Sequence, residues 1–99
     1  MRWPYPRTPE LGKGLPAAYR EGEKQFDRRV KTRFPIGSSE NELIAQVVNE
    51  GFRLDRNGGP IRSATLTRGL IAKTLWSVRW RSNNGRIDEV WGVYGAITP

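Results

Sequence analysis

The sequence contains no cysteine and no histidine. These absences exclude disulfides, thiol chemistry, metal sites built from cysteine or histidine, and every catalytic pair of a nucleophile with a histidine base. We therefore expect neither a metal nor a cofactor. The compartment stays open, because a domain without cysteine is stable in reducing and oxidising surroundings alike.

Long apolar runs are also missing. The N-terminal segment from Met1 to Arg7 lacks the apolar stretch of a signal peptide, and no window approaches the roughly 18 apolar residues of a membrane span. We expect a soluble protein, cytoplasmic by default, or periplasmic if a signal peptide has been removed.

Acidic residues are few compared with basic ones. The chain has 17 lysines and arginines against 10 acidic residues, a net charge of +7 over 99 residues. This excess favours an acidic protein surface, nucleic acid or an anionic membrane as partner. The alternative is a coding bias toward arginine, which would give the same composition. The dispersal of the charges along the chain agrees with this alternative. With 36% apolar residues, the chain has ordinary globular composition and room for one domain.

Residues 1–15 are rich in proline and glycine. This composition predicts an extended arm, followed by a single α+β domain over residues 16–99. Within the arm, Gly12-Lys13-Gly14 lacks the spacing, the following serine or threonine and the preceding strand of a phosphate-binding loop. We interpret it as a joint before the first helix.

Residues 16–33 predict a first helix. Pro16 suits its first position, and Pro35 ends it because the residue before a proline is pushed out of the α region. One face carries a stripe with spacings of three or four residues, formed by Tyr19, Glu23, Phe26, Val30 and Phe34. The opposite face is basic and interrupted by acidic residues: Arg20, Lys24, Arg28 and Lys31 against Glu21 and Asp27.

A second helix is predicted from about Glu40 to Glu50. Ser39 and Glu42 form a capping box, in which each side chain satisfies a free backbone N–H at the helix start. Gly51 occupies the position where a glycine commonly ends a helix. The apolar stripe of this helix consists of Leu43, Ile44, Val47 and Val48.

Residues 52–55, 64–68, 74–82 and 87–97 predict strands separated by turn-forming clusters. A two-residue type I′ turn at Asn84-Gly85 would pair residues whose numbers sum to 169. The apolar face would then pair Trp76 with Val93, Val78 with Trp91, and Trp80 with Glu89. The mixed face would pair Arg81 with Asp88, Arg79 with Val90, and Leu75 with Tyr94. A three-residue loop with a bulge would instead bring Arg79 opposite Glu89.

These elements predict an α+β fold with two N-terminal helices packed on one face of a three- to four-stranded antiparallel sheet, an α-α-β-β-β meander. Trp76, Trp80 and Trp91 would then be core residues beneath the helices. The alternative is a stacking platform for single-stranded nucleic acid, where aromatic residues on a sheet are flanked by arginines.

The order of elements resembles the small envelope proteins of the BamE and SmpA type and the β-lactamase-inhibitor-protein-like fold that they share. The resemblance covers about residues 26–97, with Ile36-Gly37-Ser38-Ser39-Glu40-Asn41-Glu42-Leu43 opening the second helix. Residues 33–38, 51–52 and 76–81 also look like a group of small bacterial proteins. The resemblance implies a non-catalytic domain that docks on another protein by its sheet face or loops. Membrane anchoring does not carry over, because the BamE-type lipoproteins begin at a lipidated cysteine.

Paired carboxylates are the remaining acid–base chemistry. Asp88 and Glu89 are neighbours in a predicted strand and therefore point to opposite faces. Glu40 and Glu42 are explained as helix-start residues. Because no base, nucleophile and orienting group can be assembled, the sequence predicts a protein that is not an enzyme.

The mixed face of the sheet is the predicted binding surface, since arginine and tyrosine are favoured at interface hot spots. Its predicted partner-binding residues are Arg68, Leu75, Arg79, Arg81, Val90 and Tyr94. We expect them to dock on a protein with an acidic surface. The alternatives are a small basic nucleic-acid-binding protein, whose affinity would fall steeply with salt, and a merely solvated face. The oligomeric state stays open.

Overall fold

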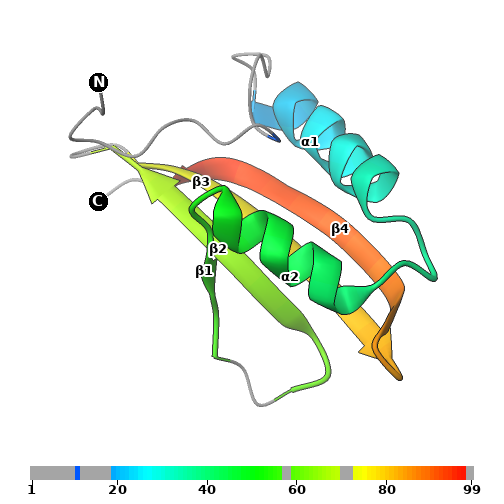
Figure 1. The fold of residues 1–99 in the computed structure, drawn as a ribbon. Coiled ribbons are helices and arrows are strands. Elements are labelled where there is room, and N and C mark those ends of the chain that lie inside the picture. Colours follow the sequence, from blue (N-terminus) through cyan, green and yellow to red (C-terminus); the bar gives the residue numbers. More distant parts are fainter. Residues whose placement is uncertain (1–10, 12–18, 57–58, 70–72, 98–99) are drawn as a thin grey trace.

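The computed structural model describes residue 11 and residues 19–56, 59–69 and 73–97. Within these residues, two helices precede four strands: α1 (Tyr19–Arg33), α2 (Glu40–Asn49), β1 (Arg53–Leu54), β2 (Arg62–Arg68), β3 (Lys73–Asn83) and β4 (Arg86–Ile97) (Figure 1). The four strands form one antiparallel sheet in the order β1-β2-β3-β4. The predicted α+β class and the order of helices before strands are confirmed. The predicted arm over residues 1–15 lies outside the described residues apart from Leu11.

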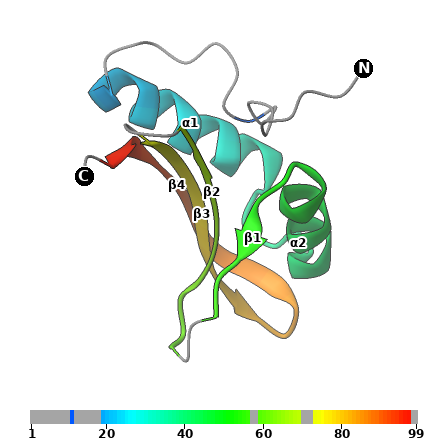
Figure 2. The ribbon, with the colours of Figure 1, turned by 90° about the vertical axis from the view of Figure 1, so that its left-hand side faces the viewer.

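Both helices lie on the same face of the sheet (Figure 2). We call this face the helix face and the other the open face, because no described helix lies on it. The core lies between the helices and the helix face, where burial removes apolar side chains from water. It contains Leu11, Phe26, Val30, Phe34, Leu43, Val47, Phe52, Ala64, Leu66, Trp76, Val78, Trp80, Ile87 and Val90.

The start of α2 follows its sequence signals. The Oγ atom of Ser39 accepts a hydrogen bond of 3.3 Å from the backbone N–H of Glu42, which confirms Ser39 as the N-cap. Gly51 follows the C-cap with φ of 101°, a left-handed conformation that glycine adopts without strain. The predicted stripe is wrong at Val48, which is 51% exposed, because the buried contacts of α2 come from Leu43 and Val47.

The hairpin between β3 and β4 begins as predicted. Asn84 and Gly85 have φ of 54° and 77°, the two positive values that a type I′ turn requires. Next to the turn, Asn83 pairs with Arg86 and Ser82 with Ile87. The two-residue turn at Asn84-Gly85 is therefore confirmed.

The predicted register beyond the turn is wrong. Arg81 pairs with Glu89, so Asp88 is an extra residue without a partner in β3, a β-bulge. A shift of one residue exchanges the two faces of a strand. Trp76 therefore lies opposite Tyr94, Val78 opposite Gly92 and Trp80 opposite Val90, and the bulged alternative with Arg79 opposite Glu89 is wrong as well.

The outer edge of β4 is covered by the segments that precede the sheet in the chain. Near the turn, the loop after α1 bonds to β4: the N–H of Gly37 donates to the carbonyl of Ile87 and the N–H of Ile87 to that of Ser38. Farther along, α1 lies beside β4 (Figure 1). The N–H groups of Gly92 and Tyr94 donate to the carboxylates of Asp27 and Glu23 at 2.9 and 3.4 Å. This edge is thereby closed to pairing with another strand.

Glu40 at the start of α2 ties this helix to the sheet. Its Oε2 atom accepts hydrogen bonds from Nε1 of Trp80 at 2.8 Å and from Nη1 of Arg62 at 2.9 Å. Burial raises the pKa of the Glu40 carboxyl, but hydrogen bonds from Trp80, Ser82 and Arg62 and the charge of Arg62 outweigh it, so this pKa is lowered. Glu40 is thus more than a helix-start residue, the only role that its sequence position suggested.

Candidate functional site

The predicted partner-binding residues are divided between the two faces, in the case of Val90 and Tyr94 because of the bulge at Asp88. On the open face, β3 carries Leu75, Arg79 and Arg81, which alternate with the core residues of the same strand. Both arginines are exposed and Leu75 is half-buried. These three are brought together on one surface.

The other predicted residues belong to the helix face. Val90 lies opposite Trp80 and is only 4% exposed, so it is a core residue. Tyr94 lies opposite Trp76, with ring centroids 6.0 Å apart, and packs against the core. Arg68, at the end of β2, is two residues from the buried Leu66 and therefore lies on the helix face as well. The structure therefore does not place these three beside Arg79.

Trp91 is the open-face residue that the sequence analysis missed. It lies directly opposite Arg79 and is half-buried, whereas the predicted register placed it in the core opposite Val78. Val93 lies two residues farther along β4 on the same face. The predicted core position is confirmed for the buried Trp76 and Trp80 and wrong for Trp91, which lies on the open face. The alternative, a stacking platform of all three tryptophans, is wrong.

A row of hydroxyl groups crosses the middle of the open face. Oδ2 of Asp55 accepts hydrogen bonds from Ser63 at 2.8 Å and from Thr65 at 2.7 Å. The hydroxyls of Thr65 and Ser77 are 3.2 Å apart. Because the Thr65 proton goes to Asp55, Ser77 donates to Thr65. Ser77 in turn accepts a long hydrogen bond of 3.4 Å from Nε of Arg79.

Positive charge predominates on the open face. Several exposed cations lie on it, and Asp55 and Glu89 are acidic residues on it. The cations include Arg53 opposite Thr65, and Lys73, Arg79 and Arg81 of β3. The Arg81 and Glu89 side chains approach to 3.9 Å and are 51% and 59% exposed, so water screens this pair strongly. The arginines remain accessible to an acidic partner.

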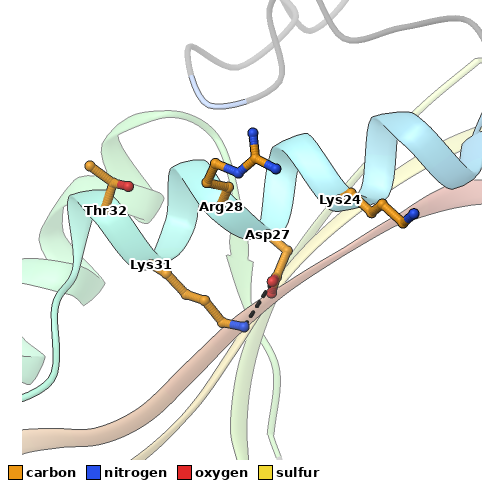
Figure 3. Close-up of a pocket in the computed structure, with 5 residues that line it drawn as sticks. All are labelled: Lys24, Asp27, Arg28, Lys31 and Thr32. Atoms are coloured by element: carbon orange, nitrogen blue, oxygen red, sulfur yellow. Dashed lines mark ion pairs between the residues drawn. The ribbon is translucent and has the colours of Figure 1, made fainter.

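The helix side presents a different surface. An open depression of about 480 Å³ on α1 is lined by Lys24, Asp27, Arg28, Lys31 and Thr32 (Figure 3). Within it, Nζ of Lys31 lies 2.8 Å from Oδ2 of Asp27. Among the described residues, no group of three or more acidic, histidine or cysteine side chains is arranged to hold a metal ion. None of the helices in the described ranges is long and apolar enough to cross a membrane.

Comparison with known proteins adds no family to this description. The chain matches no protein-family model, and neither a curated protein nor a solved structure matches it. Nothing in these comparisons links the chain to the BamE and SmpA type, so this resemblance stays a prediction. The function must be argued from the chain's own residues.

Proposed function

We propose that this protein is a non-enzymatic binding domain that docks on a protein partner with an acidic surface through the open face of its sheet. The observation that carries the proposal is Trp91, a half-buried tryptophan on a face without a described helix, directly opposite the exposed Arg79. Tryptophan and arginine are the residue types most enriched at interface hot spots. Here they stand side by side on a rigid scaffold of paired strands.

The surroundings of this pair support the same function. Leu75 and Val93 are half-buried apolar residues on the open face, and Arg81 and Arg53 are exposed cations on it. An apolar centre with a charged rim is the usual anatomy of a protein–protein interface. The positive rim favours an acidic partner through electrostatic complementarity, which acts mainly on specificity and on the association rate.

The test combines partner capture with matched charge reversals. The wild-type protein captures partners from extracts of the cells that produce it, and the affinity of each captured protein is then measured with purified variants. We expect R79E/R81E to weaken binding by about tenfold or more, because both arginines would face an acidic surface. The control K24E/R28E reverses two exposed charges of α1 and should leave this binding unchanged. Undiminished binding by R79E/R81E would remove the open face as the docking surface.

A photo-crosslinking residue gives an independent readout. Placed at Leu75, it lies on the open face and should form an adduct with the captured partner. Placed at Val48, which is 51% exposed on α2, it should not. An adduct from position 48 alone would contradict the proposed surface.

A further inference from the structure

α1 lies on the side of the sheet opposite the open face (Figure 2), and its exposed residues form a second basic surface. We define this surface by Arg20, Lys24, Arg28 and Lys31, which are all exposed. Their spacings of four, four and three residues align them along one side of the helix. With a rise of 1.5 Å per residue, the row extends over about 16 Å.

The carboxylates of α1 neutralise this row only in part. Glu23 and Asp27 accept hydrogen bonds from the backbone of β4, and Asp27 also pairs with Lys31. Asp27 interrupts the basic face in part, because its Oδ1 atom accepts from Gly92 while its Oδ2 atom lies 2.8 Å from Nζ of Lys31. Glu21 lies 3.8 Å from Lys24, with both side chains more than 60% exposed, so this pair is weak.

The long side chains of the row diverge around the depression on α1. Lys31 extends toward Asp27, the amine of Lys24 is directed away from Asp27 along the helix, and Arg28 projects from the opposite side of the helix (Figure 3). Four cations are thus spread over three turns of helix, with the hydroxyl of Thr32 beside them. Such a row does not surround a single small anion. Its length and spacing fit an extended polyanion.

Of the extended polyanions, duplex nucleic acid fits the row best. A duplex carries a phosphate charge every 1.7 Å or so of its axis, and a protein releases condensed counterions by placing lysine and arginine beside these phosphates. The solvent side of α1 carries no aromatic residue between Arg20 and Thr32, so it offers no stacking platform for the bases of a single strand. Phosphate contacts alone give binding without sequence preference.

We infer that the basic row Arg20, Lys24, Arg28 and Lys31 on α1 binds the phosphate backbone of double-stranded nucleic acid independently of base sequence. This inference does not rest on the proposed docking function, since the two surfaces lie on opposite sides of the sheet. The protein would then join an acidic protein on one side to a duplex on the other.

The test is fluorescence anisotropy of a labelled random-sequence DNA duplex, titrated with the full chain at several salt concentrations from about 50 to 200 mM. Four phosphate contacts predict a plot of log affinity against log salt with a slope of roughly −3 to −4. K24Q/R28Q should reduce the magnitude of the slope by about 2 and weaken binding at low salt by at least tenfold or so. The control R79Q/R81Q, on the open face, should keep both slope and affinity.

Four outcomes would overturn the inference. The first is no duplex binding at about 50 mM salt. The second is an affinity that falls with R79Q/R81Q and not with K24Q/R28Q. The third is that a single strand binds more tightly than the duplex and that this binding is lost in Trp91→Ala. This result would place the nucleic-acid-binding site on the open face. Vesicles containing phosphatidylserine serve as a further probe, and binding to them without binding to the duplex would also refute it. Circular dichroism confirms that each variant is folded.

Discussion

The backbone N–H of Gly92 in β4 donates a hydrogen bond to Oδ1 of Asp27 in α1 at 2.9 Å. The same glycine lies beneath the ring of Phe26, where a Cβ atom would come within 2.7 Å of Cδ2. It would also lie 3.2 Å from the Asp27 Cα, which belongs to the helix backbone. The polar contact and the missing side chain together set how closely α1 approaches the sheet.

Gly92→Ala should therefore displace α1. We expect a loss of about 1–3 kcal/mol in the free energy of unfolding, the range for overpacking a core. Urea denaturation measures it. Gly95→Ala is the matched control in the same strand, because nothing lies within 4 Å of its added Cβ atom, and its stability should be unchanged or slightly higher. Equal stability of Gly92→Ala and wild type would contradict the close approach of α1.

Glu40→Ala should destabilise the fold through the Trp80 indole. Trp80 is fully buried, and its Nε1–H would lose the acceptor that lies 2.8 Å away. An unsatisfied buried donor costs about 1–3 kcal/mol. Urea denaturation at neutral pH measures this loss, and Asn41→Ala, an exposed position in the same helical turn, is the control. A loss no larger than that of the control would refute the role of Glu40 as an anchor.

The lowered pKa of Glu40 also predicts how stability depends on pH. The ionised carboxylate stabilises the folded state above the ordinary pKa of 4.5, and this contribution is lost as the pH falls through the lowered folded-state pKa. The stability difference between wild type and Glu40→Gln should therefore stay constant between about pH 5 and 7 and shrink on further acidification. An increase of this difference in acid would contradict the direction of the pKa shift.

Trp91 and Trp80 should respond differently to truncation. Trp80 is completely buried beneath the helices, so Trp80→Ala should cost about 3–5 kcal/mol or prevent folding. Trp91 is half-buried on the open face, and Trp91→Ala should cost only about 1 kcal/mol by the area it covers. Chemical denaturation compares the two variants. Equal losses would mean that Trp91 is a core residue.

Deletion of Asp88 should remove the bulge without changing the pairing beyond it. Asp88 has no partner in β3, and Ser82–Ile87 and Arg81–Glu89 are the pairs on either side of it. Ile87 and Glu89 would then be neighbours on opposite faces, as in a regular strand. We expect nuclear Overhauser contacts between Trp80 and Val90 to persist. Their replacement by contacts between Trp80 and Glu89 would show that Asp88 does not set the register.

Local signals in the sequence were sufficient to predict the helices and strands. They were not sufficient to predict which face of the sheet each residue of β4 occupies. The capping serine Ser39 and the turn residues Asn84 and Gly85 act through their own backbone, so they can be recognised one segment at a time. The bulge leaves no comparable sign, because Asp88 and Glu89 can both pair with Arg81. One unnoticed residue then exchanged the faces of Trp91, Val90 and Tyr94, and Val90 and Tyr94 are two of the six predicted binding residues.

The long-range roles of acidic residues were beyond sequence reasoning for another reason. Asp27 and Glu23 meet the backbone of β4 across 65 and 71 residues of chain. Glu40 meets Trp80 across 40 residues. Each contact exists only because the helices pack on the sheet, and before packing these carboxylates resemble any exposed acid on a helix. The three-dimensional arrangement alone distinguishes them.

The hydrogen-bonded row from Arg79 through Ser77 and Thr65 to Asp55 has a consequence for recognition at the open face. Each hydroxyl in this row already has a defined donor and acceptor, so these side chains have given up most of their rotational freedom before any partner arrives. Ser77 is only 1% exposed, so a partner docks over this row rather than on the Ser77 hydroxyl, and fixing the row costs little additional conformational entropy on binding. The partner meets a preorganised row with fixed polarity, positive at Arg79 and negative at Asp55.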